Sequence, residues 1–517
     1  IQRSVFDRHH TLKTAFDPGW LVPIFVDEAL PGDTFDLNLS LFGRLSTMAV
    51  PVMDNIYLET FFFAIPYRLV WQNWQKFNGE RDTPNASTDY HIPVLSDFTA
   101  TVGSLSDYLG LPIGVPLHNI SSLWHRAYRL VFDEWFRDEN LQSYGNVPKG
   151  DGPDNPAILD ALVRRRKTKN DYFCSCLPWP QKGPGVEIPL MGNAPVYGLS
   201  GTGMRLDTGS LSVHHNLFGF ESSSTRPGGV DFVRNASVQD AFNLVSKEKA
   251  EADSEPSNVY ADLSGASAAT INELREAFQI QRLYEADARG GTRYTEILRA
   301  HFGVVSPDAR LQRPEYLGGT ATRIAVHPVS QQSATTTVTP QGNLAAFATV
   351  GEVQHVFTKS FTEHNLILGL VNVRADLTYQ QGIPRMFSRR TRFDFYWPTL
   401  AHLGEQAVLN KEIYAQGTAA DDEVFGYQER WAEYRYKPSQ ITGKLRSTAS
   451  DSLDVWHLAQ KFDNLPTLSS GFIQENPPIS RVVAVQNQPK IILDADFGLR
   501  CARPMPVYSV PGLIDHF

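Results

Sequence analysis

Apolar and polar residues alternate most regularly between residues 34 and 41. Phe35, Leu37, Leu39 and Leu41 fall on one side of this run, and polar side chains fall on the other. A repeat of two residues is typical of a strand with one buried face, and the Pro-Gly-Asp sequence directly before it favours a turn. By similar patterns, further strands are expected at residues 21–26, 55–65, 322–326, 352–357, 366–373, 392–397, 481–485 and 490–493.

In the middle of the chain, apolar residues recur at the spacing of a helix instead of that of a strand. Residues 123–139 place Trp124, Tyr128 and Trp135 at helical spacing. The capping box Thr270-Ile-Asn-Glu273 predicts the start of a long helix, which Gly290-Gly291 would end. Two shorter helices are expected at residues 67–77 and 293–301.

Strand patterns near both ends of the chain enclose a middle that is rich in loops and helices. Residues 192–268 are rich in glycine and serine and show little periodicity, which predicts a surface insertion. We therefore divide the chain into residues 1–191, this insertion, and residues 269–517. The expected fold class is all-β, an antiparallel β-sandwich with long loop and helix insertions.

The last residues of the chain are apolar and carry three prolines, which favours an extended arm. An apolar chain end suggests a terminus that is held against another surface. That surface is either a neighbouring subunit or the arm's own domain, and the arm alone does not separate the two. The contact residues of an inter-subunit arm would be Pro504, Pro506, Tyr508, Pro511, Ile514 and Phe517.

Composition narrows the class of protein. The formal net charge is -9, which argues against a protein whose whole surface coats nucleic acid. Three cysteines do not make a disulfide framework, and they indicate reduced thiols in a protein made in a reducing compartment. The longest apolar run, residues 61–65, is too short to span a bilayer, so we expect no membrane insertion.

No motif in the sequence indicates catalysis or a bound metal. The chain has neither a Gly-x-Ser-x-Gly elbow nor a Gly-Lys-Ser/Thr phosphate loop. Adjacent side chains on a strand point to opposite faces, so the pairs His9-His10 and His214-His215 do not predict a chelate. We expect no catalytic residues, no metal ligands and no cofactor.

Basic residues cluster with aromatic residues at three places. This combination suits single-stranded nucleic acid, because cations follow the phosphates and rings stack on the bases. The same alternation also describes an ordinary strand with one buried and one solvated face. The candidate nucleic-acid residues are Arg164, Arg165, Arg166, Lys167, Lys169, Arg385, Arg389, Arg390, Arg392, Arg435 and Lys437.

Long motifs spread from end to end resemble one family. They include Met53-Asp-Asn-Ile-Tyr-Leu-Glu-Thr-Phe-Phe-Phe63 and Gly426-Tyr-Gln-Glu-Arg-Trp-Ala-Glu-Tyr-Arg-Tyr-Lys-Pro438. Others lie at residues 4–9, 16–24, 30–34, 171–182, 287–294 and 305–316 and in the C-terminal arm. With these motifs the chain resembles the major capsid protein of gokushoviruses, small single-stranded-DNA bacteriophages of the Microviridae.

The resemblance implies a viral eight-stranded jelly roll made of two four-stranded antiparallel sheets. Sixty copies would assemble in the bacterial cytoplasm into a T=1 icosahedral shell, the capsid of the virion, around a circular single-stranded DNA genome. A small basic internal protein, a minor pilot protein and a host surface receptor would be further partners. One insertion of this family forms a host-facing protrusion at each three-fold axis. We place it at residues 192–268, with the candidate residues Arg205, His214, His215, Phe218, Phe220 and Arg226.

Two other functions remain compatible with a β-sandwich, because jelly rolls serve many purposes. One is a trimeric lectin-like adhesin, which a soluble trimer that binds glycans without forming shells would favour. The other is a β-sandwich hydrolase acting on polysaccharide, with the nine tryptophans as sugar platforms. A purified monomer with hydrolytic activity would favour the hydrolase.

Overall fold

The computed structural model divides into two compact units, residues 1–182 with 284–517, and residues 183–283. It describes residues 3–167, 171–183, 271–291, 294–303, 312–333, 335–337 and 340–508, together with four two-residue strands between residues 196 and 261.

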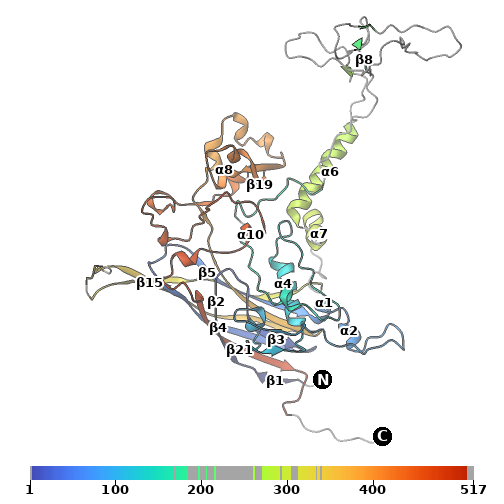
Figure 1. Cartoon of the computed structure of the whole chain (residues 1–517). Helices are drawn as coiled ribbons and strands as arrows, with labels where there is room; N and C mark the ends of the chain where they lie inside the picture. The colour runs from blue at the N-terminus through green and yellow to red at the C-terminus, as the bar shows by residue number, and fades with distance from the viewer. Residues whose placement is uncertain are drawn as a thin grey trace, which may run out of the picture. The chain divides into compact units, whose positions relative to one another are not determined.

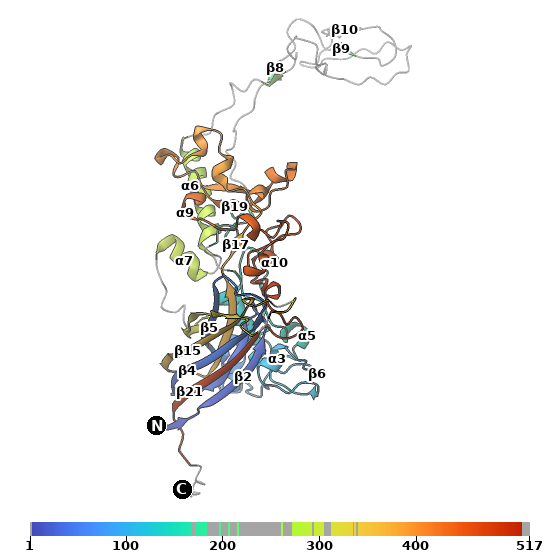
Figure 2. The same cartoon turned by 90° about the vertical axis from the view of Figure 1, so that its left-hand side faces the viewer.

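Two antiparallel sheets form a sandwich in the larger unit (Figures 1 and 2). One sheet has six strands within the described residues: β1 (Ser4–Asp7), β2 (His10–Phe16), β21 (Ile491–Arg503), β4 (Thr34–Met48), β15 (Leu344–Ser360) and β14 (Ala325–Ser330). The other has five: β12 (Glu315–Gly318), β13 (Ala321–Arg323), β5 (Ile56–Pro66), β16 (Asn365–Ala375) and β3 (Val22–Ala29).

The all-β jelly-roll class expected from the sequence is confirmed. Both sheets are wider than the four strands that the resemblance implied. The first sheet gains strands because β1 and β2 each pair with a different part of β21. The second gains strands because β12 and β13 both pair with β5.

The main apolar core lies between the sheets. The predicted strand at residues 34–41 is part of β4, and its Phe35, Leu37, Leu39 and Leu41 are all buried. In β21, alternate residues from Ile491 to Cys501 face the same core. The strict alternation in β4 and β21 therefore indicates that their sheet has one buried face.

β16 is buried along nearly its whole length because the five-stranded sheet is covered on its second face as well. Leu366, Leu368 and Leu370 pack there against helix α4 (Leu123–Val131) and helix α1 (Tyr67–Val70). Burial on both faces explains the continuous apolar run of the sequence at this strand.

The predicted helices are found with shifted ends. The run at 67–77 breaks into α1 and α2 (Trp74–Phe77), and the run at 123–139 is α4 followed by the π-helix Phe132–Phe136. α6 (Ile271–Gly290) and α7 (Tyr294–Phe302) lie where the capping box and the glycines place them. The remaining α-helices are α3 (Leu105–Tyr108), α5 (Pro156–Leu159), α8 (Asn410–Ile413), α9 (Ala432–Arg435) and α10 (Ser470–Ile473).

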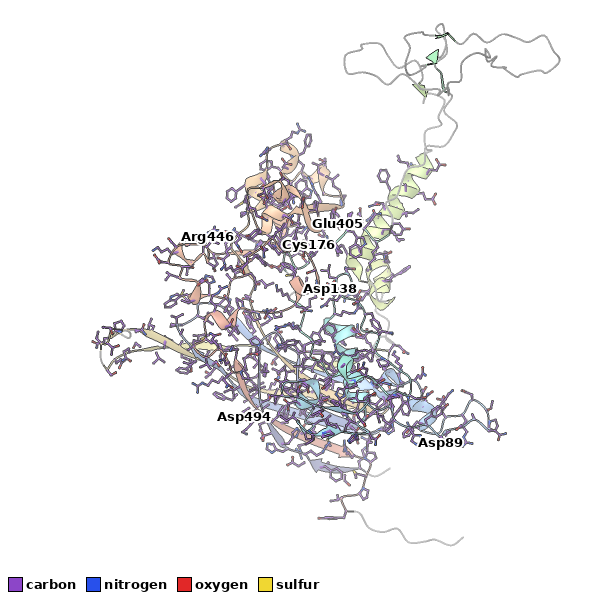
Figure 3. The ribbon with its side chains drawn as sticks, in the orientation of Figure 1. Asp89, Asp138, Cys176, Glu405, Arg446 and Asp494 are labelled. Carbon is purple, nitrogen blue, oxygen red and sulfur yellow. The ribbon has the colours of Figure 1, made fainter. Side chains whose placement is uncertain are left out.

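A second lobe of the larger unit, formed by residues 171–182 and 377–473, has its own apolar core. It contains the hairpin β18 (Glu405–Leu409) and β19 (Val424–Glu429) and the parallel pair β17 (Thr378–Tyr379) and β20 (Ser439–Gln440). Figure 1 shows α8 next to this hairpin, and Figure 3 places Cys176 and Glu405 in the lobe and Asp494 on the sandwich. Cys174, Cys176 and Cys501 are free and buried.

Two predicted strands are wrong. Residues 392–397 begin with the 3-10 turn Arg392–Asp394. The Asp394 carboxylate caps this turn by accepting hydrogen bonds from the amides of Arg390 and Thr391, which directly precede it. Residues 481–485 follow the 3-10 turn Ile479–Arg481 and contribute only an isolated bridge between Val483 and Met48.

The smaller unit, residues 183–283, is described only in part. β8 (Val196–Tyr197) pairs with β11 (Tyr260–Ala261), and β9 (Arg205–Leu206) pairs with β10 (His215–Asn216). Short strands β6 (Phe98–Thr99) and β7 (Pro116–Leu117) form a similar pair in the larger unit. Across the described residues, no helix is long and apolar enough to cross a membrane.

Candidate nucleic-acid and subunit-contact surface

Two of the three predicted basic clusters come together in the second lobe. The segment at 385–397 folds into the 3-10 turns Arg385–Ser388 and Arg392–Asp394, and the segment at 430–437 contains α9. The Arg389 guanidinium lies over the rings of Phe395 and Tyr434, at 5.2 and 4.5 Å from their centres. Arginine and aromatic side chains from both segments therefore form one surface.

Hydrogen bonds hold these segments in place. The indole N–H of Trp431, which is buried, donates to the Leu400 carbonyl over 2.9 Å. The indole N–H of Trp397 donates to the Arg392 carbonyl over 2.9 Å. Two backbone amides, those of Thr391 and Arg390, donate to the Asp394 carboxylate, and these hydrogen bonds lower its pKa.

We call these side chains together the ring–arginine surface. Its exposed members are Met386, Phe387, Phe393, Phe395, Tyr396, Trp397, Tyr434 and Arg392, and its partly buried members are Arg389 and Arg430. The sequence prediction included the first two of these arginines but left out Arg430 and the rings as site residues. Their signal was present in the motif at 430–437, where Arg430 and Trp431 are adjacent.

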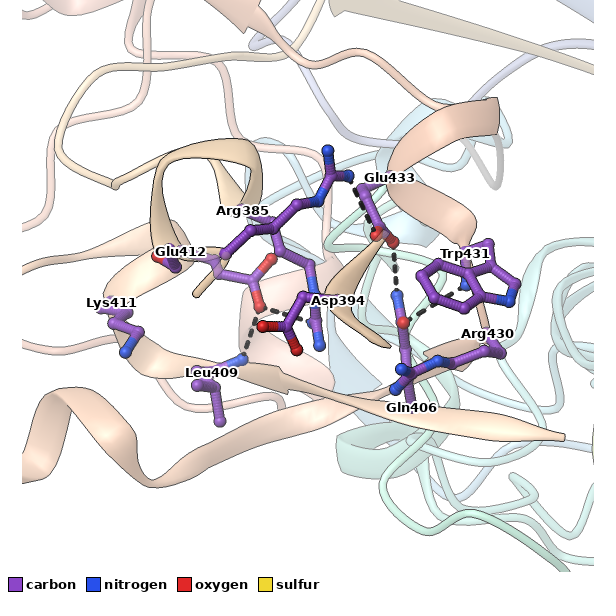
Figure 4. A pocket seen from close by; sticks show the side chains of 11 residues that line it. Arg385, Asp394, Gln406, Leu409, Lys411, Glu412, Arg430, Trp431 and Glu433 are labelled. Carbon is purple, nitrogen blue, oxygen red and sulfur yellow. Dashed lines mark hydrogen bonds and ion pairs between the residues drawn. The ribbon is translucent and has the colours of Figure 1, made fainter. Parts of the chain in front are cut away.

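Behind this surface lies a polar cavity of about 200 Å³ (Figure 4). The Arg385 guanidinium lies 3.0 Å from the Glu412 carboxylate, and Gln406 donates to Glu433 over 2.7 Å. Burial raises the pKa of Glu412, although the charge of Arg385 opposes that shift. Arg385 and Arg389 are thus each paired with a carboxylate of the same lobe, Arg389 with Glu433.

A larger cavity of about 490 Å³ opens beside the first. Its wall contains rings from separate parts of the chain, Tyr172, Tyr379 and Tyr436, together with Arg446 and Lys437. The two predicted cations Arg435 and Lys437 are exposed, and Arg435 forms a 2.6 Å ion pair with Glu429. Arg390 is exposed as well.

The third predicted cluster lies elsewhere, between the sandwich and the second lobe. Arg164 stacks over Trp20 at 4.2 Å and donates to the carbonyl of Glu475. Arg165 is paired with Glu59 and Arg166 with Asp138.

Lys167 is almost fully buried and lies over the ring of Phe472. The charges of Arg165 and Arg166 are therefore matched by carboxylates of the same subunit, which favours a bracing role for the cluster. Nucleic-acid contact by these residues stays a prediction. Lys169 lies outside the described residues.

The residues predicted for the protrusion and the arm are only partly described. Arg205 lies in β9 opposite Asn216, and His215 lies opposite Leu206. Pro504 is half-buried, while Pro506 and Tyr508 are exposed. The predicted residues outside the description are His214, Phe218, Phe220, Arg226, Pro511, Ile514 and Phe517.

The described residues contain no group of three or more His, Cys, Asp or Glu side chains that could hold a metal ion. The sandwich fold alone does not separate a capsid protein from other jelly-roll proteins. Comparison with known proteins shows the family to which the chain belongs.

Residues 1–513 match the family described as capsid protein (F protein). The chain is 47% identical over 526 residues to capsid protein VP1 of Bdellovibrio phage phiMH2K, covering 100% of this chain and 96% of the relative. It is 44% identical to capsid protein VP1 of Chlamydia phage 1 and 38% identical to capsid protein VP1 of Spiroplasma virus 4, each match covering 99% of this chain and 96% of the relative.

The chain belongs to this family of capsid proteins, and its relatives are those of gokushoviruses. It is therefore a structural component of the virion that assembles with copies of itself, and it is not an enzyme. The adhesin and hydrolase alternatives are set aside by the same match.

Proposed function

We propose that sixty copies of this chain form a T=1 icosahedral shell around a circular single-stranded DNA genome. The observation that supports the proposal is the match to capsid proteins over residues 1–513 on a jelly-roll sandwich. In such a shell, contacts around five-fold and three-fold axes are heterologous and close into rings, whereas two-fold contacts are isologous.

The formal net charge of -9 bears on how the genome is packaged. Nucleic acid carries one negative charge per phosphate, so an acidic shell needs cations from another source. A small basic internal protein would supply them, and a minor pilot protein would complete the particle.

The insertion at residues 192–268 is proposed as the host-facing protrusion. It lies within a stretch, residues 183–283, that forms a compact unit of its own. A separate unit can carry receptor contacts without disturbing the sandwich that makes the shell.

The proposal is tested by expressing the full chain with and without its small basic partner and examining the product by electron microscopy. Closed, uniform shells of T=1 size that protect circular single-stranded DNA from nuclease are expected in the presence of the partner. A chain that stays monomeric or trimeric with the partner present would contradict the proposal.

A further inference from the structure

Large apolar side chains of the ring–arginine surface are exposed and are not part of the lobe's own core. Phe387 is 71% exposed, Phe393 58% and Tyr434 52%, although the same lobe buries Phe173 and Phe425 almost completely. Large contiguous apolar patches on soluble proteins mark interaction sites, because leaving them in water is costly.

Contacts within the lobe hold the side chains of this surface in position without a partner. Trp397 and Trp431 are tied to backbone carbonyls, and Arg389 is held between two rings while it pairs with Glu433. Rigid aromatic and arginine side chains lose little conformational entropy on binding, and these residue types dominate the binding energy of protein–protein contacts.

The charge of this region favours a protein over DNA as the occupant. Residues 380–440 contain eight basic and eight acidic side chains. Asp422 and Glu429 are exposed together with Arg435 and Lys437, so both signs border the rings. A DNA strand would be repelled by the exposed carboxylates, whereas another protein can pair with charges of both signs.

We propose that the ring–arginine surface is a contact between copies of this chain in the shell. The inference rests on the proposed function, since it names the partner of a surface within that assembly. A second copy is the occupant because the chain assembles with itself, and because an exposed aromatic centre with a rim of mixed charge has the composition of an interface between subunits.

The direct test is photochemical cross-linking from Phe387, replaced by p-benzoylphenylalanine. The full-length variant is irradiated as assembled shells and, as a control, as dissociated subunits at the same concentration. Covalent dimers are expected from shells but not from dissociated subunits. Shells that yield DNA adducts or no dimers would overturn the inference and leave the proposed function intact, whereas a wild-type chain that forms no shells contradicts both.

Two matched variants give an independent readout. Phe387→Glu should lower the yield of shells on the order of tenfold or more, as loss of a central interface residue does, without changing the subunit's circular dichroism. The control, Arg390→Gln at an exposed arginine outside the ring–arginine surface, should form shells with unchanged DNA content. Normal shells from Phe387→Glu, or DNA loss confined to the arginine variant, would overturn the inference in favour of a DNA contact.

Discussion

At the scale of single residues, Arg126 shows how a charge can be kept inside the molecule. It is completely buried, and its guanidinium forms two hydrogen bonds of 2.7 and 2.9 Å with the Asp154 carboxylate. Its third nitrogen donates to the carbonyls of Val70 and Gly150. This one side chain thus joins α4 to the end of α1 and to the loop at residues 150–154.

We expect Arg126→Ala to lower the free energy of unfolding by about 3–5 kcal/mol, because the Asp154 carboxylate would remain buried without its partner. The matched control is Arg435→Ala, whose ion pair with Glu429 is about half exposed and should contribute less than about 1 kcal/mol. Thermal or denaturant unfolding of the soluble subunit measures both. Equal losses in the two variants would contradict this interpretation of Arg126.

The raised pKa of buried Glu475 makes the stability of the folded protein depend on pH. Burial raises the pKa of this carboxyl to about 7 from an ordinary 4.5, even though Lys167 and Arg165 act in the opposite direction. The folded protein therefore holds the proton more tightly than the unfolded chain. For this reason, Glu475 lowers the free energy of unfolding as the pH rises from about 4.5 to about 7, by at most about 3 kcal/mol.

Glu475→Gln cannot titrate, so its melting temperature relative to wild type should rise between pH 5 and pH 8. The exposed Glu429→Gln serves as the control and should shift little relative to wild type over that range. Melting curves of the three proteins at the two pH values decide the matter. Parallel behaviour of wild type and Glu475→Gln would show that this carboxyl does not titrate as described.

At the scale of elements, the backbone at Gly382, just before the ring–arginine surface, passes close to the backbone of α8. A methyl group added at Gly382 would lie 1.9 Å from the carbonyl oxygen of Glu412, which is a backbone atom of α8. Gly382→Ala should therefore force the two segments apart and cost about 1–3 kcal/mol.

Gly351 in β15 is the matched control, since a methyl group there would meet no atom within 4 Å. Gly351→Ala should leave stability within about 0.5 kcal/mol of wild type. Limited proteolysis of the second lobe, compared with the melting temperature, would show where Gly382→Ala acts. A variant as resistant as wild type would mean that the backbone adjusts at little cost.

The same scale shows what sequence patterns could predict. Residues 34–41 and 366–373 were found because burial on one or both faces leaves a periodic or continuous apolar pattern in β4 and β16. Residues 392–397 alternate as well, yet the Asp394 side chain caps a 3-10 turn through the amides of the two preceding residues, and the rings are exposed. Alternation alone does not distinguish a strand from a loop that presents its apolar side chains to a partner.

The candidate site was predictable as two separate segments but not as one surface. The basic and aromatic residues at 385–397 and 430–437 stand out in the sequence. Their union depends on contacts between residues far apart in the chain, such as Arg389 with Tyr434 and Trp431 with Leu400. Equally, the carboxylates that pair with Arg165 and Arg166 come from distant positions, and sequence spacing does not reveal them.

At the scale of the whole molecule, shell formation and attachment to a host are expected to be separable. The sandwich, the second lobe and their contacts lie in one compact unit, while residues 183–283 form another. Because the strands on either side of the insertion pair within the first unit, removing part of the insertion leaves both sheets their hydrogen-bonding partners.

Deletion of residues 200–255, closed by a short Gly-Ser linker, should therefore leave assembly mostly intact and abolish attachment to cells. Electron microscopy of the particles and a cell-binding assay measure the two properties on one preparation. Particles of the Phe387→Glu variant, if they form at all, should be few but able to attach. The opposite pattern, in which the deletion prevents folding, would show that the insertion is part of the core and that attachment cannot be assigned to it alone.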